Sequence, residues 1–431
     1  MAVIEAGPLG GTCLNRGCIP SKMLIHSADV IETIKNAHLF GIKVKGYDID
    51  FPSIIRRVTE SVDEDSRSIE EGLKSVDNPK LFKEECRFVG HKTIRAGKET
   101  LTAGYILVAS GGRPRIPKID GLDDSGFITS DQALRLKTQP KMLTILGGGY
   151  VAVELAHFYG SLGTKINIVQ RHGLLVPNED EDVARAFTEI FRQKYNVLTG
   201  FEPTKVSKRG GSQYEVTVKS VKSRDEKVLK SDQLLVAAGR QPNSDGLDLD
   251  KTGVRTDEKG FIVTDPYLET NVKGIFALGD VVGHYLFRHS ANLEAEYDFF
   301  NMLDPENKTP VDYSAMPHAI FSSPQIAGVG KTEQQLKGGK VDYVVRKYNY
   351  IDTAMGHAIE ERTGFVKFLL ERDSRRILGC HIMGVDASTL IHEVIVAMKA
   401  GDGSISNILR AVHIHPALSE VVQRAASAYQ T

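Results

Sequence analysis

The sequence predicts an α/β fold of two related units, followed by a C-terminal α+β domain. Residues 142–169 alternate as strand, glycine turn, helix and strand, the order expected of a parallel sheet. Two apolar segments, 105–112 and 234–240, each end in small residues, which indicates a weak internal duplication. From about residue 315 the pattern changes to alternating strands and a long amphipathic helix over 387–400.

The first unit opens with a short apolar strand at residues 1–5, which we expect to be buried. A loop then leads to a helix over 19–37, and alternating charged and apolar residues predict a solvent-facing helix over 61–73. The apolar strand over 105–112 follows, and segment 274–280 returns to the same unit later in the chain.

We therefore expect three domains. The first comprises residues 1–138 and continues at 266–314, the second comprises 139–265, and the third comprises 315–431. A chain of 431 residues is too long for one ordinary core, which agrees with this division.

Composition limits the classes of partner. Lys and Arg total 54 against 55 Asp and Glu, so the formal net charge is -1 and gives no reason to expect nucleic acid or an anionic membrane as partner. No apolar run approaches the length of a membrane span, so we expect no membrane association. Four cysteines, two of them isolated, fit a reducing compartment and predict a cytoplasmic protein.

Two cysteines, Cys13 and Cys18, flank a turn-forming stretch at 15–17 and precede an apolar, helix-like segment. Cys18 is thereby placed near a helix N-terminus, where the dipole and free N–H groups favour a thiolate. The pair is typical of a redox-active dithiol, with a structural disulfide or half of a zinc site as alternatives. Cys86 and Cys380 are isolated and supply no second pair, so we predict no metal site.

Gly147, Gly149 and Ala152 form a glycine turn between the strand and the helix of the second unit. Such a turn lets the backbone approach a pyrophosphate and points a helix N-terminus at it, so it predicts dinucleotide binding. A tight turn without a ligand is the alternative. The next strand ends in Gln170 and Arg171, where an acid would bind the ribose of NAD and an Arg accommodates the 2′-phosphate of NADP. Arg171 favours NADP, although Gln170 is compatible with NAD and Arg171 could be a surface charge.

His415 precedes Pro416, which suits the first turn of a helix, and Glu420 would follow one turn inside it. A histidine at a helix start can accept a thiol proton, and a nearby carboxylate fixes its tautomer. The pattern predicts acid–base catalysis. A helix-capping histidine, or a metal site formed with His413, are the alternatives.

The run from Gly10 to Lys22 resembles the active-site segment of the class I pyridine nucleotide–disulfide oxidoreductases, a family of flavoenzymes. The resemblance covers nearly the whole chain and includes the glycine turn and the segment 415–420. It implies two Rossmann-like domains that bind FAD and NADP or NAD, a C-terminal dimerisation domain, and a redox disulfide between Cys13 and Cys18, with Cys18 facing the flavin.

The same resemblance implies roles for other residues. Lys22 and Glu154 would pair beside flavin N5. His415 and Glu420 would be the base and its orienting carboxylate, and they would act on the dithiol of the other subunit of a homodimer. The residues expected to contact the cofactors are Glu5, Gly11, Thr12, Lys22, Ser110, Gly111, Asp280, Gly147, Gly149, Ala152, Gln170, Arg171, Gly239 and Arg240.

The chain departs from the family pattern at its start. The family normally opens with a strand, a Gly-x-Gly-x-x-Gly turn and a helix that hold the FAD pyrophosphate, and here Met1 stands where the second strand should begin. We therefore expect an FAD pocket that is incomplete as written, with the central strand of the first sheet absent. Either the start is misassigned or truncated, or the protein lacks this part.

Several stretches are most similar to the mycothione reductase branch, among them segments 20–30, 149–152 and 289–295. We therefore predict a flavin-dependent NAD(P)H:disulfide oxidoreductase (EC 1.8.1 type) that reduces a small-molecule disulfide. The first alternative is dihydrolipoamide dehydrogenase, which runs the same path towards dithiol oxidation. An alternative of another class is an inactive, flavin-free nucleotide-binding remnant.

Overall fold

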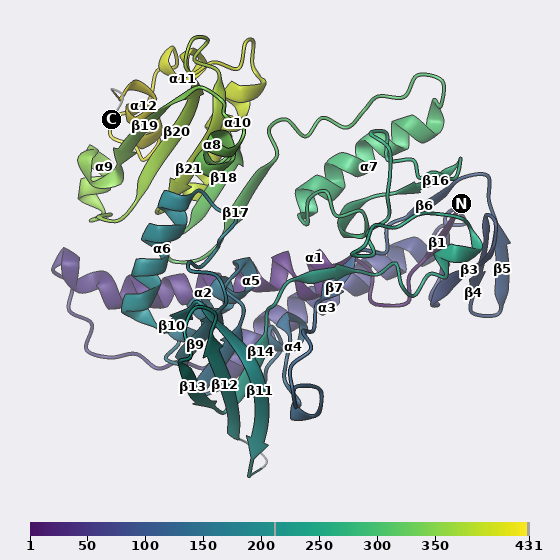
Figure 1. The fold of residues 1–431 in the computed structure, drawn as a ribbon, viewed down its shortest axis with the longest axis horizontal. Coiled ribbons are helices and arrows are strands. Elements are labelled where there is room, and N and C mark those ends of the chain that lie inside the picture. Colours follow the sequence, from purple (N-terminus) through teal and green to yellow (C-terminus); the bar gives the residue numbers. More distant parts are fainter. Residues whose placement is uncertain (211–212, 429–431) are drawn as a thin grey trace.

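A computed structural model describes residues 1–210 and 213–428 of the chain, and it shows the predicted mixed α/β fold (Figure 1). In Figure 1 the C-terminal sheet and its helices lie at the upper left, and β1, β3–β6 and β16 lie at the right. No helix among the described residues is long and apolar enough to cross a membrane. The domain boundaries given above stay a prediction.

The first unit contains small sheets and three long helices. β1 pairs in parallel with β2, β6 pairs in parallel with β16, and β3, β4 and β5 form an antiparallel sheet. The two parallel pairs belong to separate two-stranded sheets. The elements are β1 (Ala2–Ile4), α1 (Gly11–Arg16), α2 (Cys18–Asn36), η1 (Ala37–Phe40), α3 (Phe51–Lys74), β2 (Lys80–Phe82), β3 (Cys86–Gly90), β4 (Thr93–Ala96), β5 (Glu99–Thr102), β6 (Ile106–Val108), β7 (Gly112–Pro114), η2 (Asp123–Ser125), α4 (Ser130–Ala133), β16 (Ile275–Ala277), η4 (Gly279–Val281) and α7 (Arg288–Leu303).

Two expectations for this unit need correction. The strand at 1–5 is found as β1, but it is half-exposed rather than buried, because β2 is its only strand neighbour among the described residues. The helix predicted over 61–73 begins earlier, at Phe51, because the Asp50 side chain caps it by accepting a hydrogen bond from Ser53 N.

The second unit is built on the parallel sheet β10-β9-β8-β14. The strand–turn–helix–strand predicted at 142–169 is confirmed as β8, α5 and β9. An antiparallel sheet of β11, β12 and β13 adjoins it. The elements are β8 (Met142–Leu146), α5 (Tyr150–Ser161), β9 (Lys165–Gln170), α6 (Glu181–Lys194), β10 (Asn196–Thr199), β11 (Phe201–Arg209), β12 (Gln213–Ser220), β13 (Glu226–Ser231), β14 (Gln233–Val236), β15 (Arg240–Pro242) and η3 (Leu249–Lys251).

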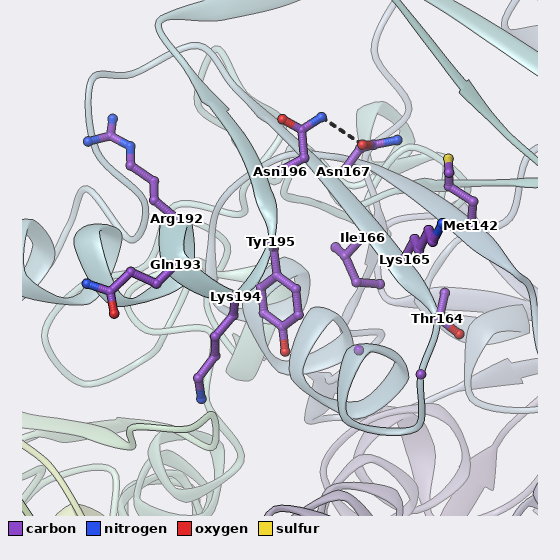
Figure 2. A pocket seen from close by; sticks show the side chains of 12 residues that line it. Met142, Thr164, Lys165, Ile166, Asn167, Arg192, Gln193, Lys194, Tyr195 and Asn196 are labelled. Atoms are coloured by element: carbon purple, nitrogen blue, oxygen red, sulfur yellow. Dashed lines mark hydrogen bonds between the residues drawn. The ribbon is translucent and has the colours of Figure 1, made fainter.

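A pocket of about 440 Å³ lies at the amino ends of β8, β9 and β10, where Figure 2 shows Lys165, Tyr195 and Asn196 among its lining. The glycine turn at 147–149 follows the opposite, carboxyl end of β8. Ligands of parallel α/β sheets bind at the carboxyl ends of the strands. None of the residues singled out in the sequence lines this pocket, so it contributes nothing to the candidate site.

The C-terminal unit is the antiparallel sheet β17-β18-β21-β20-β19, packed against α10 and α12. The long amphipathic helix predicted over 387–400 is confirmed as α10. The elements are β17 (Pro317–Ile320), β18 (Ile326–Gly330), α8 (Glu333–Gly338), β19 (Tyr343–Asn349), η5 (Tyr350–Asp352), α9 (Ala354–Ala358), β20 (Phe365–Glu371), β21 (Ile377–Met383), α10 (Ala387–Lys399), α11 (Ser406–Leu409) and α12 (Glu420–Ser427).

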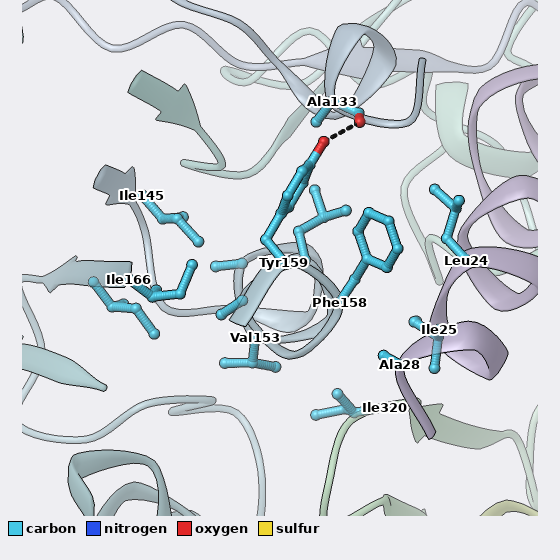
Figure 3. Close-up of a cluster of buried hydrophobic side chains, with 14 of the residues drawn as sticks. Leu24, Ile25, Ala28, Ala133, Ile145, Val153, Phe158, Tyr159, Ile166 and Ile320 are labelled. Carbon is cyan, nitrogen blue, oxygen red and sulfur yellow. Dashed lines mark hydrogen bonds between the residues drawn. The ribbon is translucent and has the colours of Figure 1, made fainter. Parts of the chain in front are cut away.

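The apolar face of α2 packs against α5, which joins the cysteine helix to the helix behind the glycine turn (Figure 3). Leu24 and Ala28 of α2 and Val153 and Phe158 of α5 are buried in one cluster. Each fully buried aliphatic or aromatic side chain contributes about 1.5–3 kcal/mol. This packing fixes the two helices relative to each other, and with them the polar side chains at their ends.

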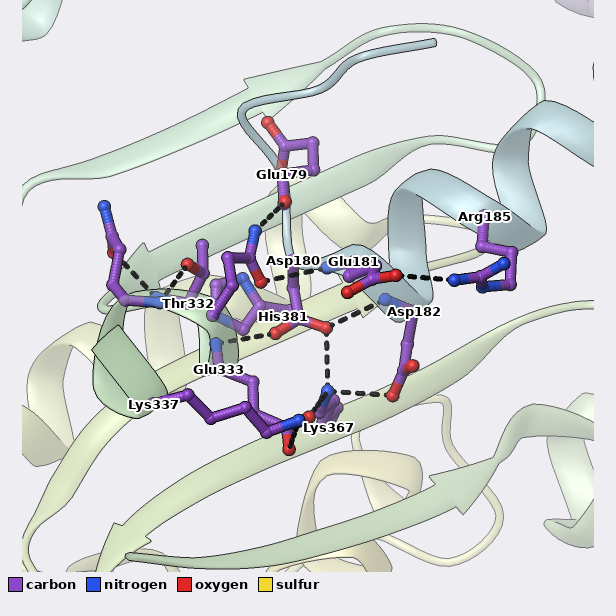
Figure 4. A network of polar contacts seen from close by, with 12 residues as sticks. Glu179, Asp180, Glu181, Asp182, Arg185, Thr332, Glu333, Lys337, Lys367 and His381 are labelled. Carbon is purple, nitrogen blue, oxygen red and sulfur yellow. Dashed lines mark hydrogen bonds and ion pairs between the residues drawn. The ribbon is translucent and has the colours of Figure 1, made fainter. Parts of the chain in front are cut away.

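An ion cluster built around a buried ammonium joins the second unit to the C-terminal unit (Figure 4). The Lys367 ammonium on β20 lies 2.8 Å from Asp180 Oδ1, 2.8 Å from Asp182 Oδ2 and 2.5 Å from Glu333 Oε2. Burial lowers the pKa of Lys367, but the three carboxylates raise it more, so it stays above its ordinary value and the side chain stays charged. We call these four residues the Lys367 junction.

A second polar cluster lies next to the Lys367 junction. The buried Glu179 carboxylate accepts hydrogen bonds from Tyr150 Oη at 2.5 Å and His318 Nε2 at 2.8 Å. The Tyr150 ring, at the start of α5, stacks on Phe287 and on His318. Tyr150 therefore contacts all three parts of the molecule.

Candidate active site

Cys13 and Cys18 lie on two consecutive helices. Cys13 is in α1, and Cys18 is the first residue of α2, as the sequence predicts. The intervening stretch is not a simple turn, because residues up to Arg16 continue α1 and only Gly17 separates the helices. A Cβ on Gly17 would lie 2.8 Å from Thr12 O, so only glycine fits where the chain passes between them.

The two sulfurs are unequal. Both cysteines are free thiols in this structure. The hydrogen bond from Cys13, and then the charge of Lys22, lower the pKa of Cys18 to about 6, against an ordinary value of 9.0. The same hydrogen bond and burial raise the pKa of Cys13 well above its ordinary value. Reduced protein therefore holds one thiolate, on Cys18, and one thiol, on Cys13.

Lys22 and Glu154 form an ion pair one turn into α2. Lys22 Nζ lies 2.8 Å from Glu154 Oε2 and 3.0 Å from Oε1, in the arrangement that the family resemblance implies. Phe321 completes the contact, because its backbone N–H donates to Glu154 Oε1 and its ring lies 4.6 Å from the ammonium. Packing of α2 on α5 brings the pair together, although 132 residues separate the two side chains in sequence.

The glycine turn has the shape that a bound pyrophosphate requires. A Cβ on Gly147 would lie 2.1 Å from Ala237 O, so the turn cannot carry a larger residue there. Gly149 is the N-cap of α5 with no side-chain cap, and the space around its Cα is open. Ala152 is fully buried, which permits close packing of α5. These features leave the first N–H groups of α5 free for an anion.

The end of β9 carries the two residues expected to contact the nucleotide ribose. Gln170 is buried against the glycine turn, where its Cβ would lie 3.0 Å from a Cβ on Gly148. Arg171 is exposed, and no ion pair or hydrogen bond holds its side chain within the described residues. Only Arg171 is therefore free to meet a phosphate.

The residues expected to contact FAD fit the group in part. Ser110 Oγ is buried without a hydrogen-bond partner among the described residues, and added Cβ atoms on Gly11 and Gly111 would meet nothing within 4 Å. An orphaned hydroxyl beside open backbone fits a polar ligand. Asp280 lies in η4, where Arg240 Nε donates to its Oδ2 at 3.0 Å. 

The remaining cofactor candidates lie on loops or at element ends. The Glu5 carboxylate follows β1 and accepts the Gly7 N–H at 2.7 Å. Thr12 is half-buried in α1, and Gly239 takes a left-handed backbone conformation just before β15. No hydrogen bond among the described residues joins Glu5 to Asp280 or Ser110.

His415 and Glu420 form the expected pair. His415 Nδ1 donates to Glu420 Oε1 at 3.0 Å and Oε2 at 3.1 Å, and this bond holds the pKa of Glu420 below its ordinary range. The expected helix start at Pro416 is wrong. α12 begins at Glu420, because residues 417–419 form a turn in which Glu420 N donates to Ala417 O. The His415 side chain is 70% exposed, and no contact with Cys13 or Cys18 exists within the described single chain.

Sequence reasoning missed two residues that the site contains. Phe321 donates its backbone N–H to Glu154, and the charge of Arg288 lowers the pKa of Cys13 against the influences that raise it. Both residues come from distant segments without a local signal.

Comparisons with known proteins agree with this geometry. A family model described as "Pyridine nucleotide-disulphide oxidoreductase" matches residues 1–295, and one described as its dimerisation domain matches residues 316–426. A mycothione reductase of Mycobacterium tuberculosis (strain ATCC 25618 / H37Rv) is 36% identical, covering 98% of this chain and 93% of that protein. The mitochondrial dihydrolipoyl dehydrogenase 1 of Arabidopsis thaliana is 34% identical, covering 98% and 84%.

Among solved structures, the HOCl-induced flavoprotein disulfide reductase RclA from Escherichia coli superposes with a TM-score of 0.86 at 26% identity, covering 99% of this chain and 93% of that one. Two family models, and relatives that align over nearly the full length, therefore match this chain and its fold. The chain belongs to the pyridine nucleotide–disulphide oxidoreductase family, and it is an FAD-dependent enzyme that exchanges electrons between NAD(P) and a disulfide or dithiol.

Proposed function

We propose that the enzyme reduces a small-molecule disulfide at the expense of NAD(P)H through the Cys13–Cys18 pair. The observation that carries the proposal is the unequal pair of sulfurs, a thiolate on Cys18 stabilised by Lys22 and a thiol on Cys13. A thiol beside a stabilised thiolate is suited to disulfide exchange, because one sulfur attacks while the other closes the cycle.

Bound FAD supplies the path by which an electron pair from the nicotinamide reaches the Cys13–Cys18 disulfide. His415 removes the proton of Cys13, whose sulfur attacks the substrate disulfide and forms a mixed disulfide. The released substrate thiolate takes that proton from His415. The Cys18 thiolate then attacks the Cys13 sulfur, re-forms the Cys13–Cys18 disulfide and releases the second substrate thiolate, which is protonated by solvent.

The proposed active site is shared between two subunits of a homodimer. The dimerisation domain supports the homodimer, and the exposure of His415 supports its action on the cysteines of the partner subunit. Val412 and Ile414 beside it are 99% and 78% exposed in the single chain, as expected of a surface that a second copy covers. We also propose a cytoplasmic location, because the cysteine content fits a reducing compartment.

We propose NADPH as the preferred nucleotide, since Arg171 is exposed at the end of β9 and unpaired among the described residues. The dihydrolipoamide dehydrogenase reaction is the second candidate, which the Arabidopsis relative supports. Steady-state kinetics with mycothiol disulfide and NADPH, against lipoamide and NADH, separates the two. A kcat/KM that is at least tenfold higher for lipoamide would contradict the small-disulfide reductase.

The first experiment is an absorbance spectrum of the purified chain, followed by anaerobic NADPH and then NADH. We expect a flavin band that bleaches, faster with NADPH, and gives way to a long-wavelength absorbance. Colourless protein that does not reconstitute with added FAD would contradict the proposed function for this chain and favour the inactive remnant.

A second test addresses the sulfurs directly. The rate at which iodoacetamide alkylates Cys18 in the reduced protein should rise with pH and reach half its maximum near pH 6, against an ordinary thiol value of 9.0. Cys13→Ala should move the midpoint upward most and Lys22→Gln less, because the Cys13 hydrogen bond is the larger cause. A midpoint that stays above 8 would contradict the thiolate assignment.

A further inference from the structure

The loop of residues 412–416, which carries His415, is held by side chains rather than by its backbone. No backbone hydrogen bond involves these residues within the part of the chain that the structure describes. Val412 and Ile414 are almost fully exposed, so they add little packing inside the subunit. The loop is therefore anchored through its two histidines.

The two histidines of this loop make separate contacts with carboxylates. His413 is 6% exposed, and its Nε2–H donates a short hydrogen bond to Glu393 on α10. His415 is 70% exposed, and it donates to Glu420 at the start of α12. His413 therefore faces the body of the domain, whereas His415 faces solvent.

The Glu393 end of the contact is on a rigid element. α10 packs on β17, β18 and β21 and contributes Ile391 and Val394 to the buried core on either side of Glu393. The His415–Glu420 pair lies wholly within the segment 415–420, so it orients the imidazole relative to α12. This pair does not connect residues 412–414 to the rest of the domain. The hydrogen bond from His413 to Glu393 makes that connection, through α10.

We propose that His413 and Glu393 are positioning residues, which set the place of His415 by fixing the loop to α10. The inference rests on the proposed function, in which His415 exchanges the proton of Cys13. A catalytic group that is displaced by about 1 Å can lose on the order of 100-fold in rate, so an anchor two residues away affects catalysis without touching the substrate.

The test compares two reactions of the same FAD-loaded dimer. Reduction of a small disulfide needs His415, whereas NADPH oxidation by ferricyanide, which takes electrons from the flavin, does not. We expect His413→Ala and Glu393→Ala each to lower kcat for the disulfide about tenfold, with the ferricyanide rate within twofold of wild type. The double variant should be no slower than either single variant, because both remove one contact.

Two variants serve as internal comparisons. His413→Gln keeps an N–H close to the position of Nε2, so it should recover most of the lost kcat. His392→Ala is the matched control, since His392 is an exposed histidine on the same helix whose ring, among the described residues, hydrogen-bonds only to Thr389 O. It should change neither reaction.

A readout independent of catalysis follows from the composition, because the chain contains no Trp. Ala411→Trp places a single fluorophore at the exposed start of the loop, outside the residues proposed to meet the second copy. Its anisotropy should fall when His413→Ala is added and stay unchanged with His392→Ala. Full disulfide turnover or unchanged anisotropy in His413→Ala would overturn the proposal, as would an equal loss in the ferricyanide reaction. Full disulfide turnover in His415→Asn would instead show that His415 is not the base. That result would contradict the proposed function and, with it, this inference.

Discussion

The Lys367 junction and the 412–416 loop both hold a cationic or protonatable side chain with carboxylates, at opposite extremes of exposure. The Lys367 side chain is 1% exposed and shared among three carboxylates, while the His415 side chain is 70% exposed and contacts one. A buried ammonium without partners is costly, so the carboxylates of the junction are needed for the stability of the fold. An exposed imidazole costs little to leave unpaired, so the loop can place it for chemistry. The same pairing of charge therefore serves architecture in one region and proton transfer in the other.

The largest effect is expected from a substitution in the 412–416 loop. His415→Asn should lower disulfide turnover about 100- to 10,000-fold, the range for a positioned acid–base group, as measured by steady-state kinetics. Its free energy of unfolding should stay within about 0.5 kcal/mol of wild type, because the side chain is exposed. Loss of stability without loss of turnover would erase the contrast between the two regions.

The second largest effect is expected from a substitution in the Lys367 junction. Lys367→Met leaves Asp180 buried beside two further carboxylates, and it should lower the free energy of unfolding by about 3–5 kcal/mol in urea denaturation. Lys337→Met is the control, because Lys337 pairs with the same Glu333 but is 64% exposed, and it should cost less than about 1 kcal/mol. Equal effects of the two lysines would contradict the role of burial. If Lys367→Met yields no folded protein while the control folds, adding Asp180→Asn should restore folding.

A smaller effect concerns the cluster beside the junction. Tyr150→Phe removes one of the two donors to the buried Glu179 carboxylate and should cost about 1.5 kcal/mol of unfolding free energy. Tyr348→Phe is the matched control, since its hydroxyl donates to Asp352 O at an exposed site. The prediction fails if both tyrosines cost the same.

The smallest effect is the pH dependence of the junction. Burial raises the pKa of Glu333, but hydrogen bonds from Lys337, Lys367 and Tyr343 lower it to about 2, against an ordinary value of 4.5. A depressed carboxyl pKa stabilises the fold fully above about pH 4.5, and this stability is lost as pH falls towards 2. The difference in unfolding free energy between wild type and Glu333→Gln should therefore be larger at pH 6 than at pH 3.5. A difference that grows on acidification would have the wrong sign.

The sequence predicted elements whose signals are local. The helix expected over 19–37 is found at Cys18–Asn36, and the strand–turn–helix–strand is found at 142–170, because periodicity and glycines act within a few residues. The contacts Cys13–Cys18 and His415–Glu420 also lie within one short segment each. Sequence separation therefore did not hinder their prediction.

Features that depend on distant neighbours were not predictable in this way. The Lys367 junction joins residues 187 positions apart, and the sequence contains only ordinary charges at both ends. The exposure of β1 follows from its having one strand neighbour in the described part of the chain, which no property of residues 1–5 determines. Lys22 and Glu154 were paired only through the family resemblance, since 132 residues separate them.

One ammonium shared by three carboxylates also constrains how this protein can change over generations. Replacing Lys367 alone leaves three negative charges without their counter-ion, and replacing a single carboxylate alters the charge balance around an ammonium that is 1% exposed. Replacing the whole cluster by uncharged residues would need coordinated substitutions on α6, α8 and β20. Most variants with only some of these substitutions would fall below the stability that selection tolerates. The joint between the nucleotide unit and the C-terminal unit should accordingly drift slowly in descendants, while residues such as Val412 and Ile414 can change with the surface of their partner.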